Sequence, residues 1–206
     1  KVDITMNGYC NGFGETMDSR VVLSSNNMLL DNDLYAALLE YHKKLWYIFS
    51  PAGVVSGDFI YSAKPPDKRK MEIYADLLDV SIMCQYFPYP ITGITGKFAV
   101  DSNRIELKDV VSKRNGGTIK MQGLITQANT TNPAYDFKIL ADDIAIDSEL
   151  MNAFPAEQKK FFSNFEIQAK GDADIYIHSV NDIEMPVDYL AKLNIRGDFV
   201  KHPLLA

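Results

Sequence analysis

The feature that most constrains this fold is an internal repeat. The segment Ile4–Gly8 (Ile-Thr-Met-Asn-Gly) returns as Ile119–Gly123 (Ile-Lys-Met-Gln-Gly), a shift of 115 positions (123 minus 8). Further matches follow in the same order, at a shift of 115 or 116 with one slip of two residues. They are Val21–Leu23 with Phe137–Ile139, Met28–Asp31 with Ile144–Asp147, Leu34 with Leu150, Ala37 with Ala153, Gly53 with Gly171 after the slip, and Phe87–Tyr89 with His202–Leu204.

A collinear series of this kind is hard to obtain by chance, so we interpret the chain as two tandem copies of one module. The first copy covers 1–115, and the second, incomplete copy covers 116–206. The first residue of the chain, Lys1, leads directly into a stretch of alternating apolar and polar residues, and the last residue, Ala206, ends an apolar stretch. We therefore expect the chain to be a fragment whose parent carries any targeting signal or membrane anchor.

Each module is predicted to be rich in antiparallel strands. Apolar and polar residues alternate along 118–123, 136–141 and 165–170, and period-two alternation is typical of a sheet with one apolar face. Lys97–Val100 and Arg104–Leu107 are expected to form a hairpin. Because sequential strands usually pair, tandem modules should join edge to edge.

Helical segments interrupt the strands. Asp31 is suited to cap a helix from about Asn32 to Phe49, whereas the second copy is split into a short turn over 148–154 and a helix that begins at Pro155. The predicted fold class is mainly β with inserted helices (α+β), in which tandem antiparallel modules form a curved, groove-like sheet.

The charge pattern argues against nucleic acid as a partner. The net charge is −6 and the lysines and arginines are scattered, whereas a phosphate-binding surface gathers them on one face. No apolar run reaches the roughly 18 residues of a membrane-spanning helix. Cys10 and Cys84 match no metal or redox spacing, and we expect free thiols in preference to one long-range disulfide.

No residues are arranged for catalysis, metal binding or a cofactor, so we expect a protein that is not an enzyme. His42, His178 and His202 are too few and too dispersed. The acidic pair Asp142–Asp143 is predicted to turn the chain between two strands, and Asp147 to cap the following helix. Carbohydrate binding through Trp46, or through Tyr86, Phe87 and Tyr89, is a weaker alternative.

The candidate binding site is the apolar face of the strands. As the core of a closed sandwich it would be structural, and as an open groove it would receive lipid acyl chains at a gain of roughly 0.8 kcal/mol per buried methylene. The sequence leaves both possibilities open. The residues expected to line it are Ile4, Met6, Val21, Leu23, Phe98, Val100, Ile119, Met121, Phe137, Ile139, Ile167 and Ile175.

The second copy resembles AsmA-like proteins, the superfamily that includes TamB-related proteins of the bacterial envelope. The resemblance lies in Ile94–Val100, Arg104–Val110, Gly116–Gly123, Asp136–Ile139, Ile144–Leu150, Phe154–Pro155 and Gly171. It implies a β-groove built from repeats, a periplasmic location with the parent anchored in the inner membrane, and a role in phospholipid transport or outer-membrane assembly. Its implied partners are phospholipid or another acyl lipid, and neighbouring modules of the same parent.

Overall fold

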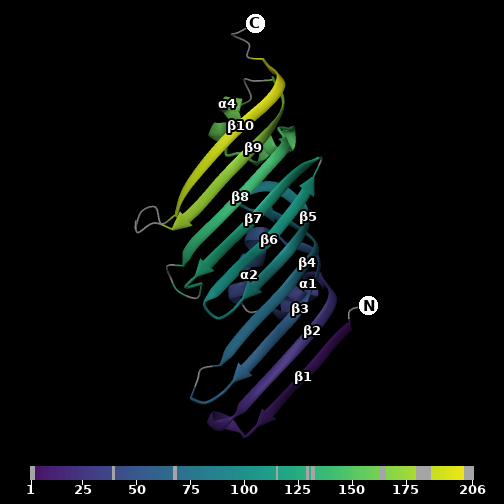
Figure 1. Ribbon diagram of the computed structural model, residues 1–206, viewed down its shortest axis with the longest axis vertical. Helices are drawn as coiled ribbons and strands as arrows, with labels where there is room; N and C mark the ends of the chain where they lie inside the picture. The colour runs from purple at the N-terminus through teal and green to yellow at the C-terminus, as the bar shows by residue number, and fades with distance from the viewer. Residues whose placement is uncertain are drawn as a thin grey trace.

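In the part of the chain that the structure describes, the protein forms one antiparallel sheet of ten strands, paired in the order in which they occur along the chain (Figure 1). The computed structural model describes residues 3–38, 40–66, 69–114, 116–128, 130, 133–162, 166–179 and 187–201. The strands are β1 (Asp3–Asn11), β2 (Asp18–Leu30), β3 (Ala52–Ala63), β4 (Lys70–Cys84), β5 (Phe87–Val100), β6 (Arg104–Arg114), β7 (Gly117–Thr126), β8 (Ala134–Ala145), β9 (Glu166–Ser179) and β10 (Val187–Lys201). The predicted mainly β, antiparallel class is confirmed.

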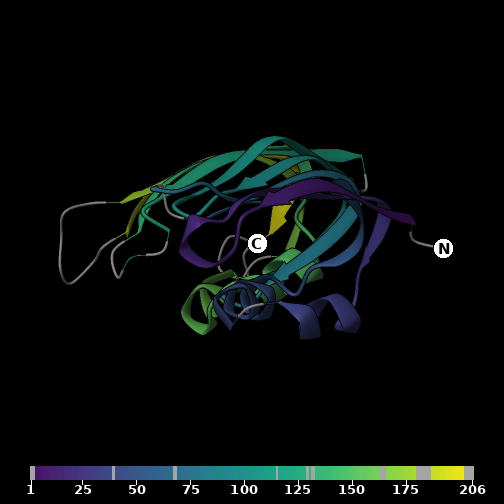
Figure 2. The same ribbon diagram turned by 90° about the horizontal axis from the view of Figure 1, so that it is seen from below.

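Short helices follow β2 and β8 and lie on one side of the sheet (Figure 2). They are α1 (Asn32–Ala37), α2 (Glu40–Phe49), α3 (Ser148–Ala153) and α4 (Ala156–Phe162), besides a single 3₁₀ turn at Gly14–Thr16. The single helix predicted over Asn32–Phe49 is wrong. Leu38 takes an extended backbone (φ −70°, ψ 150°) that ends α1, and Phe154 has the same angles after α3. At Phe154 the following proline favours that conformation, and Leu38 adopts it without one.

The strand register repeats as the sequence does. Gly8 pairs with Val21 between β1 and β2, and their counterparts Gly123 and Phe137 pair between β7 and β8. Between the next strands Met28 pairs with Val55, and its counterpart Ile144 pairs with Gly171. The structural counterpart of Gly171 is therefore Val55, and the two-residue slip that aligned Gly171 with Gly53 is wrong. Residues 202–204 of the last sequence match lie outside the described residues.

The junction between the two copies does not interrupt the sheet. β6 and β7 flank residue 115, and they pair continuously from Arg114 with Gly117 to Arg104 with Thr126, apart from one register shift. The predicted hairpin also forms here, since Val100 pairs with Ile105 and the Asp101 amide donates to the Arg104 carbonyl. The sheet is thus continuous across the predicted boundary between the two modules.

The predictions for two groups of acidic residues have different outcomes. Asp147 caps α3 as expected, with its carboxylate accepting from the Leu150 amide, and Asp31 caps α1 in the same way through Leu34. Asp142 and Asp143 do not turn the chain between two strands. They lie within β8, where Asp143 has φ of 58° and forms a bulge that strand-level alternation does not reveal.

Among the residues that the structure describes, the buried side chains form three clusters. The buried members of the first, Val55, Val80, Ile94 and Val110, come from four neighbouring strands, β3 to β6. The second joins Ile119 and Ile144 to Ala153 of α3, and the third joins Val100 and Ile105 to Leu45 of α2. The second and third clusters therefore lie between the helices and the central strands, whereas the first is formed by strand residues alone.

Candidate functional site: the inner face of the sheet

The strand register decides which side chains share a face, because directly opposed residues of an antiparallel pair point to the same side. Met6 pairs with Leu23 in the first copy, and Met121 pairs with Ile139 in the second. Ile139 in turn pairs with Ile175. Each pair joins residues that the sequence predicted to line one strip.

The intervening strands connect the two copies without a change of face. Leu23 pairs with Phe59, Phe59 with Ile73, and Ile73 with Val100. Val100 then pairs with Ile105, and Ile105 with Ile125 on β7. All twelve predicted positions lie on this face, which we call the inner face because α2 and α3 pack against it. The backbone position of Ile167 belongs to it, but its side chain lies outside the described residues.

The inner face is covered in the middle and open at its two ends. Val100 and Ile119 are 9% and 6% exposed beneath the helices, whereas Ile4 and Met6 on β1 are 64% and 71% exposed. At the other end Leu193 and Ile195 on β10 are 61% and 50% exposed.

Two separate apolar areas follow from this pattern. The first flank comprises Ile4, Met6, Val21 and Leu23, and the second flank comprises Phe137, Ile175, Leu193 and Ile195. Among the described residues, none of the three buried clusters includes a member of either flank. Phe98, Met121 and Ile139 instead pack against those clusters, so they belong to the covered centre.

The sequence-based set omitted Leu193 and Ile195, although a signal was present. Ala191, Leu193 and Ile195 alternate with Lys192, Asn194 and Arg196. The register places the apolar three on the inner face, opposite Ile175, Ala173 and Gly171.

A polar link fastens α3 to the centre of the sheet. The Arg114 guanidinium lies 5.1 Å from the centre of the Tyr89 ring, donates to the Pro90 carbonyl and forms an ion pair with Glu149. Burial raises the pKa of Tyr89, and the nearby Arg114 charge partly opposes that rise. Because Tyr89 and Ile119 belong to one buried cluster, this contact helps to hold the helix over the inner face.

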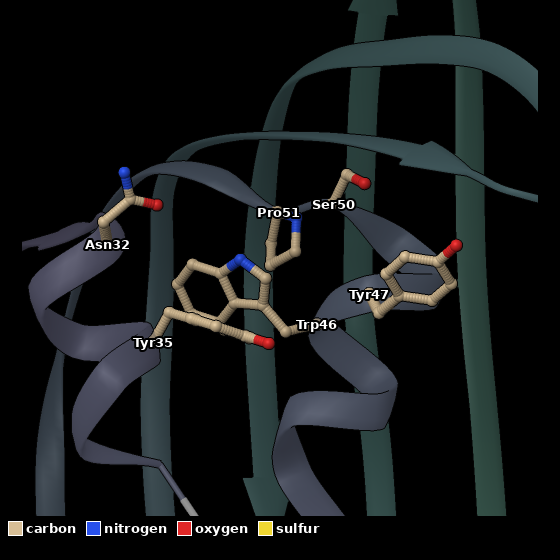
Figure 3. Close-up of a pocket in the computed structure, with 6 residues that line it drawn as sticks. All are labelled: Asn32, Tyr35, Trp46, Tyr47, Ser50 and Pro51. Atoms are coloured by element: carbon tan, nitrogen blue, oxygen red, sulfur yellow. The ribbon is translucent and has the colours of Figure 1, made fainter. Parts of the chain in front are cut away.

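A small hollow of about 290 Å³ lies beside α1 and α2 (Figure 3). The Tyr35 and Trp46 rings lie against each other, with centres 5.9 Å apart and planes tilted by 56°, and Tyr47 lies on the other side of Pro51. Asn32 and Ser50 complete the lining. The tilted rings do not form the flat platform that a sugar ring would stack on.

The second aromatic group considered for carbohydrate is not a platform either. Tyr86 is 76% exposed, but Tyr89 is 7% exposed and lies under Arg114. Phe87 packs edge-on against Phe154, with ring centres 5.5 Å apart. These rings pack around the beginning of β5 and the end of α3.

The groups considered for chemistry are also dispersed in space. His178 stacks on Tyr176 and lies 3.9 Å from Asp188, while the side chains of His42 and His202 lie outside the described residues. In the part of the chain that the structure describes, no three His, Cys, Asp or Glu side chains are grouped so as to hold a metal ion. Cys10 and Cys84 are free thiols.

Among the described helices, none has the length and apolar character needed to cross a bilayer. No protein-family model, no curated protein and no solved structure matches this chain.

Proposed function

We propose that this chain is a non-enzymatic, lipid-handling segment whose inner face forms a groove for the acyl chains of phospholipids. The observation that carries the proposal is the continuity of one apolar face across all ten strands. In keeping with the resemblance to AsmA-like proteins, the segment would act in the periplasm, within a parent anchored in the inner membrane.

The shape and exposure of the inner face support this function. In Figure 2 the strands arch over the helices, which is the form that a groove requires. Ile4 and Met6, with Leu193 and Ile195 at the other end, leave apolar side chains uncovered on the same side of the sheet. Contiguous exposed apolar surface is uncommon in proteins without an apolar ligand or partner.

The energetics need no charged or reactive group. Each methylene transferred from water gains roughly 0.8 kcal/mol, so a long acyl chain gains on the order of 10 kcal/mol as an upper bound. Because the helices cover Val100 and Ile119, the acyl chains would lie on the two flanks, and a continuous path would require the helices to move.

The covered centre favours a second candidate function. Leu45 and Ala153 already bury the inner face of the central strands, as they would in a scaffold with a dry core. Such a protein would use its surface to bind other proteins and would carry no lipid.

Native mass spectrometry of the purified chain, with a fluorescent phospholipid titration beside it, separates the two functions. We expect co-purified phospholipid and saturable uptake of the fluorescent lipid. A mass without bound lipid, together with no uptake from vesicles, would favour the scaffold.

Matched substitutions on β10 locate the lipid. Leu193 and Leu190 are 61% and 68% exposed on the same strand, but Leu190 pairs with Tyr176 on the opposite face. Leu193→Asp should lower lipid uptake at least several-fold, whereas Leu190→Asp should leave it unchanged. Equal uptake by both variants would rule out the second flank.

The same comparison on β1 tests the first flank. Met6 lies on the inner face and the neighbouring Thr5 on the outer face. Met6→Asp should reduce uptake and Thr5→Asp should not.

A further inference from the structure

We propose that the turn between β4 and β5, together with the adjacent end of α2, is a docking surface for a phospholipid bilayer. We call this surface the aromatic tip, and it consists of Tyr47, Met83, Tyr86 and Phe87. Docking does not depend on the acyl groove, because no residue of the aromatic tip belongs to either flank.

The hairpin that carries the aromatic tip has a long segment without charge. Between Asp79 and Lys97 the sequence contains no aspartate, glutamate, lysine, arginine or histidine. This segment includes the end of β4, the turn at Gln85 and Tyr86, and most of β5. The sequence that joins β3 to β4, residues 64–69, carries lysine, aspartate and arginine instead. The β4–β5 turn is therefore apolar in composition where another turn of the same sheet is charged.

The apolar side chains of this turn are exposed on both faces of the hairpin. Tyr86 is 76% exposed, Met83 47% and Phe87 36%. Met83 follows Ile82, which packs against the first buried cluster, so the Met83 side chain points to the outer face. Phe87 packs against Phe154 on the helix side. The turn would thus meet an apolar medium with side chains on each side.

Contacts with the helical segments hold the aromatic tip in place. The Gln85 amide donates to the Ile48 carbonyl over 2.8 Å, which satisfies a carbonyl in the last turn of α2. The Gln85 side-chain amide donates to the Tyr47 hydroxyl over 3.4 Å, and Tyr47 is 68% exposed. Phe87 and Phe154 lie edge to face with ring centres 5.5 Å apart. The exposed aromatic rings therefore belong to a preformed surface.

The aromatic tip is not part of an edge of the sheet. It joins the fourth and fifth of the ten strands that the structure describes. Through Gln85 it contacts α2 of the first copy, and through Phe87 it contacts the end of α3 of the second copy. The exposure of these side chains is therefore not caused by an unpaired strand.

The size of the aromatic tip favours a bilayer over a protein partner. A fully buried aromatic side chain covers roughly 150–250 Å², so the exposed parts of the four side chains amount to on the order of 400 Å². A stable protein interface takes about 800 Å² from each partner. Tyrosine also combines an apolar ring with a hydroxyl, and such side chains are enriched where hydrocarbon meets water.

The charge around the aromatic tip suits a bilayer of zwitterionic phospholipid. Lys44 is exposed one helical turn before Tyr47, where its ammonium group can reach a lipid phosphate. The chain as a whole has a net charge of −6, so a strongly anionic surface would repel it. The occupant is thus a bilayer surface without net charge.

The first test measures binding of the intact chain to phosphatidylcholine vesicles by flotation. We expect saturable binding, and Tyr86→Asp should weaken it at least ten-fold because a carboxylate would have to enter the bilayer interface. Phe13→Asp is the matched control. Phe13 is 93% exposed in the turn between β1 and β2, at the opposite end of the strands, so its replacement should leave binding unchanged. No binding by the parent chain, or equal binding by Tyr86→Asp, would overturn the proposal.

A fluorescent probe provides a second readout that requires no charged substitution. In a chain with Cys10→Ser and Cys84→Ser, an environment-sensitive dye on Tyr86→Cys should shift its emission to the blue when vesicles are added. The same dye on Phe13→Cys should not shift. An equal shift at both positions, a shift at neither, or a stable dimer through the aromatic tip without vesicles would contradict bilayer docking.

The groove and the aromatic tip can be separated experimentally. Leu193→Asp, which tests the second flank, should keep its binding to vesicles. Tyr86→Asp should still take up a soluble short-chain fluorescent phospholipid, since this ligand is not presented in a bilayer. Loss of vesicle binding in Leu193→Asp would show that the groove, and not the aromatic tip, holds the chain on the bilayer.

Discussion

The backbone amide of Asp143 donates to the carboxylate of Asp172 on the neighbouring strand over 2.9 Å. The counterpart of Asp143 in the first copy is Asn27, whose amide donates to the Ser56 hydroxyl over 3.0 Å. Both bulge residues have positive φ, 58° and 55°, a conformation that Asn and Asp adopt more readily than most residues. A side chain on the next strand thus satisfies the amide that each bulge withdraws from the strand pairing.

Acid should weaken the bulge of the second copy. The Asp143 amide, followed by the Arg196 charge, holds the pKa of Asp172 below its ordinary value. A lowered pKa contributes stability above the pKa of the unfolded chain, and that contribution disappears as the pH falls through the folded-state pKa. Asp172→Asn should therefore lower the thermal midpoint at pH 7 and narrow the difference between pH 7 and pH 3. Asp174→Asn, two residues along the same face of β9, is the control for lost surface charge.

The helix caps should contribute to stability in both copies. Asp31 accepts the backbone amides of Asp33 and Leu34, and Asp147 accepts that of Leu150, and replacing such a cap by alanine costs about 1 kcal/mol. Urea unfolding of Asp31→Ala and Asp147→Ala should show losses of that size. Asp147→Asn should retain most of the stability, because asparagine also caps helices. If Asp147→Asn lost as much stability as Asp147→Ala, the negative charge of Asp147, and not its hydrogen bond, would stabilise the helix.

Gly123 should not tolerate a side chain while Phe137 is present. A Cβ atom at Gly123 would clash with the Phe137 ring, which occupies the space above this glycine. Gly123→Ala must displace the ring and should destabilise the fold by about 1–3 kcal/mol, the usual range for overpacking. In a double-mutant cycle Phe137→Leu should relieve part of that cost. Additive losses would contradict the contact.

Two isoleucines should differ sharply in their sensitivity to truncation. Ile94 is 2% exposed at the centre of the largest buried cluster, whereas Ile4 is 64% exposed. Ile94→Ala should cost about 2–5 kcal/mol, because it removes buried methyl groups and leaves a cavity. Ile4→Ala should stay within about 0.5 kcal/mol, as exposed substitutions generally do. Chemical denaturation of both variants provides the comparison.

The single helix predicted over Asn32–Phe49 in the first copy was wrong because the residue that interrupts it is not marked by a proline. In the second copy Pro155 marks the break between α3 and α4, since proline disfavours helical backbone in the residue before it. Leu38 breaks the first copy at the corresponding place, but no proline follows it. The repeat itself carried the missing signal, because Leu34 and Ala37 align with Leu150 and Ala153 of the shorter helix.

The strand bulges explain another error. The sequence of Asp142–Asp143 is typical of a turn, and the residue with positive φ does lie there. However, β8 continues beyond it to Ala145 because Ile144 pairs again with Gly171. Residues typical of a turn form a bulge when they lie inside a paired strand. Only the pairing with the neighbouring strand distinguishes a bulge from a turn.

The sequence by itself indicated the repeat, the antiparallel strands and most of the apolar residues that share one face. It could do so because side chains alternate between the faces of a strand, and a register slip of one residue would turn every apolar residue of that strand outward. Tertiary structure alone decided which of those residues are covered. Ile4 and Ile119 occupy equivalent positions in the repeat, yet only Ile119 has β6 and α3 beside it. Burial depends on neighbours distant in the chain, and an alternating pattern carries no information about them.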